Sequence, residues 1–163
     1  MIECVQIWFG ETIPPRNMAC IDQVRGMAEQ HGAKYELIRL PAVAEPWGES
    51  DLLRIKLGAE RPYMWYLDCD MELTGWLTPT GNLPYLTQYA RGQVHCDSFY
   101  VNGRCDIFRR MLRDYVRRGL HPCYGLQAKL SRDLDRLEGC HTIPDGVIKH
   151  HFFTLKNGGY AHA

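Results

Sequence analysis

The sequence predicts an α/β fold in which helices cover a mostly parallel β-sheet. Two observations favour this class. Over residues 1–70, segments with the two-residue period of strands alternate with segments of helical period. The run Tyr63–Leu67 is apolar throughout, as is typical of a strand buried on both faces of a sheet. No repeat, low-complexity tract or linker divides the 163 residues, so we expect one domain over 1–163.

The first three elements have clear boundaries. A strand is expected at Glu3–Phe9, where β-branched and aromatic residues alternate with others. Pro14-Pro15 can begin a helix at its first turn and Gly32 can end it, and apolar residues three and four apart lie between them. Lys34–Leu40 has the pattern of a second strand.

The next segment leads to the apolar strand. Residues 41–48 are expected to form a loop, and Ser50 is predicted to cap a short helix that ends near Gly58. Asp51 would then lie at the positive end of the helix dipole. Tyr63–Leu67 follows as the third strand.

The second half mixes strands and helices. Residues 74–82 are rich in turn formers, and Phe99–Val101 is expected to be a strand. Arg104–Arg118 has the best helical pattern of the chain, and a further helix is expected at about 126–137. A turn then precedes a last short strand at Val147–Phe153.

Composition excludes several classes of protein. Lys+Arg and Asp+Glu number 19 each, which disfavours a globally basic nucleic-acid-binding protein, and a hydrophobic fraction of 45% is too high for a disordered chain. No apolar run approaches the ~20 residues of a transmembrane helix, and the N-terminal segment lacks a signal-peptide pattern. Seven scattered cysteines without a C-x-x-C pair are typical of buried thiols in a reducing compartment. We therefore expect a soluble cytoplasmic protein with no membrane span and no nucleic-acid partner.

The balanced total conceals an asymmetry of charge. Residues 1–100 hold 8 basic and 13 acidic side chains, a net of −5, whereas residues 101–163 hold 11 and 6, a net of +5. Two interpretations stay open: a solvated basic face on one amphipathic helix, or a cationic rim that faces an anionic partner or substrate.

The candidate chemistry begins with Asp68-Cys69-Asp70, directly after the apolar run. In an extended segment residues i and i+2 project to the same side, so we expect two converging carboxylates at the end of a strand, where α/β sheets bind ligands. Repulsion between them favours a bound cation, and oxygen ligands suit Mg²⁺ or Mn²⁺. The alternative is a pair of loop or cap aspartates, since ten aspartates make the pattern common by chance.

Two other acidic patterns have simpler interpretations. Asp133-Leu134-Asp135 has the same spacing but lies in a predicted amphipathic helix, so we expect it to be helix surface. His95-Cys96-Asp97 suggests a metal cluster, but consecutive residues of a strand point to opposite faces and cannot all reach one ion.

Several segments resemble a known family. Ser50–Arg54 (SDLLR) and Tyr63–Leu73 (YMWYLDCDMEL) are similar to the S/D-D-x-x-R and Y-L-D-x-D signature of small-sugar glycosyltransferases of the DxD class. These include bacterial capsular and lipopolysaccharide sugar transferases and the catalytic domains of large clostridial glucosylating toxins. Gln6–Gly10 resembles the family's opening strand, Phe99–Gly103 the strand before its acceptor-side helix, and His150–Phe153 its closing strand. The segments occur in the family's order over nearly the whole chain.

The resemblance implies a GT-A fold and a metal site. In that fold a divalent cation, Mn²⁺ or Mg²⁺, bridges the DxD carboxylates and the diphosphate of a nucleotide sugar. By carry-over, Asp70 binds the metal, and Asp68 binds the metal or the hydroxyls of the ribose or sugar. One of His150 and His151 completes the metal shell.

The same resemblance implies residues that bind the donor. Trp8 would lie against the nucleotide base, Asp51 and Arg54 would contact the donor sugar and its neighbourhood, and Lys156 would approach the diphosphate. From the residues alone, Trp8 is equally typical of strand packing, Arg54 of an ordinary helix position and Asp51 of a helix N-terminal charge. Members similar to this chain retain the anomeric configuration.

The chain also departs from the family. Arg61-Pro62 precedes the apolar strand where the family usually has Gly-Gly, and 154–157 replace the Ser-Trp or Lys-Pro-Trp that often follows the closing strand. The leading interpretation is a metal-dependent transferase that moves a sugar from a nucleoside-diphosphate sugar, a UDP-sugar, to a glycan, lipid-linked or protein acceptor. One alternative is a nucleotide-sugar-binding or assembly protein without turnover. A nucleotidyltransferase is a further alternative, but a Gly-rich phosphate loop is missing after the first strand.

Overall fold

The computed structural model describes residues 1–89, 93–103, 106–118, 140–150, 155–156 and 159–160. Its main sheet has six strands in the order β2-β1-β3-β6-β5-β7. Three neighbouring pairs (β2/β1, β1/β3 and β5/β7) are parallel, and two (β3/β6 and β6/β5) are antiparallel. The predicted α/β class with a mostly parallel sheet is confirmed. The strands are β1 Glu3–Phe9, β2 Lys34–Leu40, β3 Met64–Leu67, β5 Tyr85–Tyr89, β6 Gln93–Tyr100 and β7 His141–Thr142.

The N-terminal elements agree with their sequence patterns. β1 and β2 have the predicted bounds, and helix α1 spans Pro15–Gln30 with proline at its start. Proline suits this position because its missing N–H would have no partner inside the helix. Gly10, directly after β1, has φ 106°, a backbone conformation that favours glycine, and its N–H donates to the Leu40 carbonyl.

Helix α2 corrects the prediction for its segment. It spans Pro46–Glu60 and so begins four residues before the predicted cap at Ser50. Pro46 lies in its first turn, which a proline tolerates, and Glu49 supplies the acidic residue of that turn. Ser50 and Asp51 therefore lie inside the helix, and Asp51 is not at the dipole end.

The antiparallel elements were predicted only in part. The short strands β4 (Met71–Leu73) and β8 (Ile148–His150) pair with each other, far apart in sequence. β4 was not predicted, whereas β8 lies within the last strand expected at Val147–Phe153, of which 151–153 lie outside the described residues. β6 is much longer than the predicted strand at Phe99–Val101, and its hairpin partner β5 was not predicted. Two two-residue strands, β9 (Leu155–Lys156) and β10 (Gly159–Tyr160), form a separate ribbon.

Helix α3 spans Asp106–Arg118, close to the predicted helix. The other helix expected in this half, at 126–137, and Asp133-Leu134-Asp135 within it lie outside the described residues. None of the described helices combines the length and the apolar character needed to cross a membrane.

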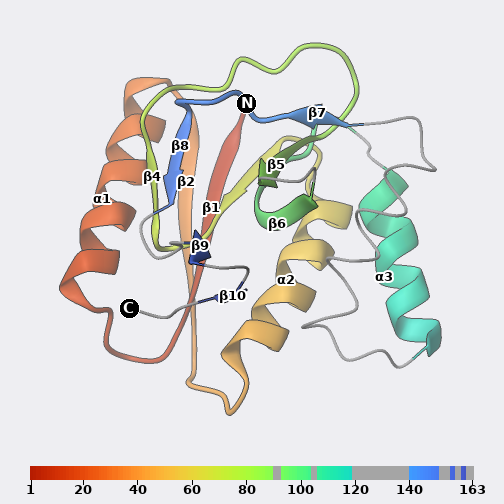
Figure 1. Ribbon diagram of the computed structural model, residues 1–163, viewed down its shortest axis with the longest axis horizontal. Coiled ribbons are helices and arrows are strands. Elements are labelled where there is room, and N and C mark those ends of the chain that lie inside the picture. The colour runs from red at the N-terminus through yellow and green to blue at the C-terminus, as the bar shows by residue number, and fades with distance from the viewer. Residues whose placement is uncertain (90–92, 104–105, 119–139, 151–154, 157–158, 161–163) are drawn as a thin grey trace.

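The elements form layers around the main sheet. Figure 1 shows α1 with β4 and β8 on one side of it and α2 with α3 on the other. The core under α2 and α3 includes Tyr66 and Phe99, and the core under α1 includes Trp65 and Leu67. The odd-numbered residues of β3 therefore face the core under α1, and the even-numbered residues face the core under α2 and α3, because side chains alternate along a strand. Gly58 lies where α2 meets α3, and a Cβ there would lie 3.0 Å from the Phe108 ring.

Candidate functional site

The site lies where β3 ends. β1, β2 and β3 are parallel, so their carboxyl ends meet at one edge of the sheet, where ligands of open α/β sheets bind. Asp68–Met71 forms a turn at this edge, because the Met71 N–H donates to the Asp68 carbonyl at 3.1 Å. The expectation of an extended Asp68–Asp70 segment is wrong, since the chain reverses here to enter β4. The Cys69 thiol points inward and donates to the Ile7 carbonyl at 3.2 Å.

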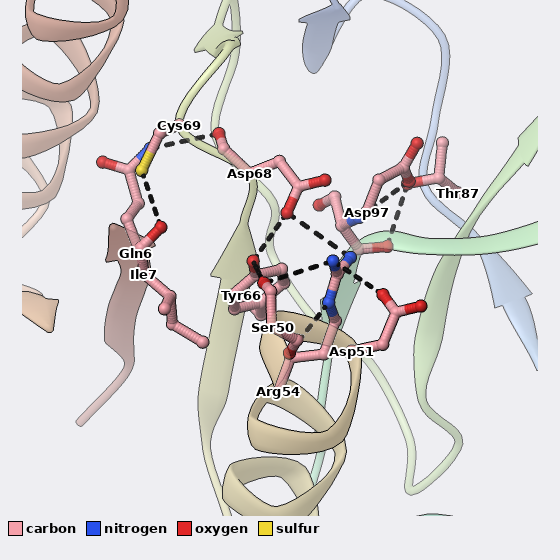
Figure 2. A network of polar contacts seen from close by, with 11 residues as sticks. Gln6, Ile7, Ser50, Asp51, Arg54, Tyr66, Asp68, Cys69, Thr87 and Asp97 are labelled. Atoms are coloured by element: carbon pink, nitrogen blue, oxygen red, sulfur yellow. Dashed lines mark hydrogen bonds and ion pairs between the residues drawn. The ribbon is translucent and has the colours of Figure 1, made fainter. Parts of the chain in front are cut away.

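Asp68 is held from the side of α2 (Figure 2). The Tyr66 hydroxyl donates to Asp68 Oδ1 at 2.6 Å, and Arg54 Nη1 lies 3.4 Å from the same oxygen. Figure 2 shows the other carboxylate oxygen directed away from both partners. The Asp68 side chain is 25% exposed, against 7% for Arg54, so it is the part of this network that reaches toward solvent.

Arg54 connects helix α2 to the end of β3. Its Nη2 lies 2.8 Å from Asp51 Oδ1, and its Nε donates to the Ser50 carbonyl at 3.3 Å. Its guanidinium also lies over the Tyr66 ring, 5.0 Å from the centroid. A buried guanidinium needs such partners because burial without them costs several kcal/mol. The structure thus brings together three residues of the predicted site: Asp51, Arg54 and Asp68.

Burial dominates the electrostatics of this network. It raises the pKa of Asp68, although the Arg54 charge and the Tyr66 hydrogen bond each lower that pKa. Burial also raises the pKa of Tyr66 well above its ordinary value, so its hydroxyl stays protonated and can donate. When Asp51 and Asp68 are both ionised, they carry more negative charge than Arg54 neutralises. The network therefore favours the approach of a further cation.

Asp97 is an acidic neighbour that sequence reasoning considered only within the His95-Cys96-Asp97 pattern and did not place in the site. It lies on β6 with 6% exposure, and its carbonyl accepts the Asp68 N–H at 2.9 Å. Its Oδ1 accepts the Ser98 N–H at 2.8 Å. An aspartate inside a strand with buried neighbours was the available signal, because a carboxylate is costly to bury without partners.

Asp70 lies toward the other side of the turn. Burial raises the pKa of the Cys20 thiol on α1, and the charges of Glu72 and Asp70 raise it further. Asp70 is therefore near α1, whereas Asp68 contacts α2. Asp70 Oδ1 is screened from solvent. The two carboxylates thus have neighbours in different layers: Arg54 of α2 for Asp68 and Cys20 of α1 for Asp70.

The other predicted metal ligands are only partly described. β4 and β8 pair with Met71 opposite His150, so the backbone places His150 across from the residue that follows Asp70. The His150 and Lys156 side chains and all of His151 lie outside the described part of the chain. Within that part, no three or more His, Cys, Asp or Glu residues form a group that could hold a metal ion.

Trp8 lies near the end of β1, at the same edge of the sheet. Its side chain is partly buried, and its indole N–H donates to the Thr12 carbonyl at 3.1 Å. It thus differs from Trp65, which is fully buried. An aromatic face at the carboxyl edge is compatible with stacking on a nucleotide base.

Three amide side chains hold the turn and the strand β4 that follows it from the side of α1, and sequence reasoning assigned a role to none of them. Gln6 Nε2 donates to the Asp68 carbonyl at 3.2 Å, and Asn17 Nδ2 donates to the Cys69 carbonyl at 3.3 Å. Gln23 contacts the Leu73 backbone twice: its Oε1 accepts the N–H at 2.9 Å, and its Nε2 donates to the carbonyl. Single amides form no motif, so only the tertiary structure reveals them.

Comparisons with known proteins place this fold. No family model and no curated protein sequence matches the chain. Among solved structures, a glycosyltransferase involved in the glycosylation of the major capsid of PBCV-1 is similar, with a TM-score of 0.66 and 12% identity over 94% of this chain and 96% of that one.

Two structures of Drosophila β1,4-galactosyltransferase 7 are also similar. A mutant in complex with manganese, UDP-Gal and xylobiose has a TM-score of 0.60, and the catalytic domain with xylobiose has 0.61. Each is 11% identical over 92% of this chain and 71% of that one. The α/β fold of this chain therefore matches that of GT-A glycosyltransferases, and at such identities the likeness concerns the fold.

Proposed function

We propose that this protein is a metal-dependent glycosyltransferase that moves a sugar from a nucleoside-diphosphate sugar, a UDP-sugar, to an acceptor. One observation carries the proposal: a buried Asp51–Arg54 pair holds the carboxylate of Asp68 at the carboxyl edge of the sheet. The fold supports it, because a solved glycosyltransferase of this fold was crystallised with manganese and UDP-Gal. The acceptor is a glycan, a lipid-linked molecule or a protein.

The carboxylates of the turn have the chemistry that suits a divalent cation, although their neighbours lie in different layers. Asp68 and Asp70 offer carboxylate oxygens, the hard ligands that Mg²⁺ and Mn²⁺ prefer. Such ions usually complete their shell with water and substrate phosphates, and His150 or His151 is the proposed protein ligand beyond the turn. When bound, the cation supplies positive charge near the leaving diphosphate, where negative charge develops.

The chain's own residues bind and orient the donor. Asp51 and Arg54 are buried, so they act on the donor sugar chiefly by fixing Asp68, whose carboxylate is partly exposed. Trp8 stacks on the base, and Lys156 approaches the diphosphate. Transfer with retention of the anomeric configuration is proposed from the family resemblance.

A thermal-shift panel of nucleoside-diphosphate sugars, with and without Mn²⁺, tests donor binding. A ligand at 100 times its Kd adds about 2.7 kcal/mol to the free energy of unfolding. Asp70→Ala should abolish the Mn²⁺-dependent shift, whereas Asp22→Ala, which removes an exposed carboxylate of α1, should leave it intact. The proposal fails if no donor shifts the melting temperature, or if the two variants behave alike.

Trp8→Ala gives the same panel a second arm. Loss of the aromatic ring on which a base stacks weakens binding by about 1–3 kcal/mol. The binding of free nucleotide should therefore weaken as much as the binding of the complete donor. The melting temperature of the free protein should change little, because Trp8 is only partly buried. Unchanged binding together with a collapse of the melting temperature would instead assign Trp8 to packing.

A further inference from the structure

Gln6 is a polar side chain in an apolar place. It lies in the middle of β1, the strand between β2 and β3, and none of its surface is exposed. A buried amide without partners costs free energy, so its contacts must be accounted for. Both ends are satisfied: the Tyr35 hydroxyl donates to Oε1 at 2.9 Å, and Nε2 donates to the Asp68 carbonyl at 3.2 Å.

Tyr35 fixes the orientation of this amide. If the Gln6 amide were turned over, its oxygen would face the Asp68 carbonyl oxygen, and two acceptors would meet without a proton between them. Burial raises the pKa of Tyr35, so its hydroxyl keeps its proton and stays a donor. The contact sequence Tyr35–Gln6–Asp68 therefore runs in one direction, from β2 across β1 to the end of β3.

The carbonyl that Gln6 holds is the one that closes the turn. Asp68 O also accepts the Met71 N–H, so a single oxygen joins the buried strand to the reversal of the chain. Asn17 holds the next carbonyl, that of Cys69, from the first turn of α1. The directions in which Asp68 and Asp70 leave the turn depend on this backbone.

We propose that Gln6, oriented by Tyr35, is a positioning residue that sets the backbone of the Asp68–Met71 turn and thereby the cation affinity of Asp68 and Asp70. The inference rests on the proposed function for its metal and on the contacts above for its mechanism. Gln6 is neutral and does not touch the cation. Replacing a residue that orients a metal ligand typically changes the metal affinity 10–100-fold.

Titration of Mn²⁺ alone, by calorimetry or by the loss of its free electron-paramagnetic resonance signal, tests the proposal. Gln6→Leu removes both hydrogen bonds and should weaken Mn²⁺ binding about 10-fold. Tyr35→Phe keeps the Gln6 amide and should have a smaller effect. The double variant should bind like Gln6→Leu, because Tyr35 acts only through Gln6.

Val24→Ala is the matched control. Val24 is fully buried in the core under α1 and its apolar side chain cannot donate to the carbonyls of the turn, so its truncation should lower stability and leave Mn²⁺ affinity unchanged. Wild-type affinity in Gln6→Leu, or fully additive effects of Gln6→Leu and Tyr35→Phe, would overturn the proposal. Tyr35→Phe keeps the test decisive if Gln6→Leu does not fold.

Hydrogen exchange of the Met71 amide separates this inference from the proposed function. The measurement needs no metal, and Gln6→Leu should speed exchange at Met71 more than at amides in the middle of α1. Equal protection at Met71 in both proteins would refute the positioning role. If wild type binds no Mn²⁺ but Met71 exchanges faster in the variant, the anchor is supported and the metal-dependent function is wrong.

Discussion

The turn at Asp68–Met71 is held from two sides by different chemistry. On the side of α2, the contacts are made to a charged side chain: the Arg54 guanidinium and the neutral Tyr66 hydroxyl contact the Asp68 carboxylate. On the side of α1, neutral amides act on the backbone: Gln6 and Asn17 donate to two successive carbonyls.

This difference predicts how the contribution of each side to stability depends on pH. Carboxylates change charge when protonated, so the contribution of the α2 side to stability depends on pH. Amides do not titrate, so the contribution of the α1 side should be nearly constant. The contacts of each side can therefore be removed by separate substitutions, and the pH dependence of the resulting loss of stability shows which side was affected.

The largest effect is expected from Arg54→Met. The substitution leaves Asp51 and Asp68 near each other without the guanidinium between them, and breaking a buried ion pair on one side costs about 3–5 kcal/mol. Without Arg54 the folded-state pKa of Asp68, which burial already raises, should rise further, because the Arg54 charge lowers it. The loss should thus be full at neutral pH and shrink as pH falls and the carboxyls take up protons.

Urea unfolding at several pH values measures this loss. Lys56→Met is the control, because Lys56 is exposed two residues further along α2 and its loss should stay within about 0.5 kcal/mol. A loss for Arg54→Met that does not change with pH would contradict the electrostatic account of the α2 side.

Gln23→Leu is the neutral counterpart on the α1 side. It removes both contacts with the Leu73 backbone and leaves a donor and an acceptor of β4 without this partner. The expected loss is about 1–3 kcal/mol, the cost of polar groups left unsatisfied. The same urea series should give a loss that is flat with pH, and a pH-dependent loss would remove the distinction between the two sides.

Much of the fold was predictable from local pattern. β1 and β2 have the predicted bounds because the alternation of their residues is strong and proline or glycine follows each strand. The start of α2 was missed because Pro46 in a run of loop-like residues gives no sign that it opens a helix. β4 was missed because a three-residue strand has little pattern of its own and pairs with β8 across more than 70 residues of sequence.

The candidate site, like the fold, could be predicted from the sequence only in part. Asp68 and Asp70 could be located from the sequence, because an apolar strand that ends in acidic residues is a local signal. The direction of their side chains could not, because a turn replaces the expected extended segment. The role of Gln6 could not be predicted either, since its partners lie in β2 and in the turn after β3.

The smallest expected effect has the opposite sign. Asp68→Asn keeps an oxygen for Tyr66 and Arg54 but removes the negative charge of a side chain that is 25% exposed. The folded-state pKa of Asp68 is raised, so the folded protein keeps the proton to higher pH than the unfolded chain does. The ionised carboxylate therefore costs stability, and this cost sets in as pH rises from the ordinary aspartate pKa near 3.8 through the raised folded value. Asp68→Asn should thus be more stable than wild type at neutral pH, and the gain should vanish below the ordinary pKa.

Parallel urea titrations at neutral and acid pH, with Asp22→Asn as the exposed control, measure this gain in stability. A loss of stability at neutral pH would mean that the attraction between Arg54 and the Asp68 carboxylate outweighs the cost of burying that carboxylate. The ionised Asp68 would then stabilise the fold. A gain would mean that the fold keeps a destabilising carboxylate where the proposed cation binds.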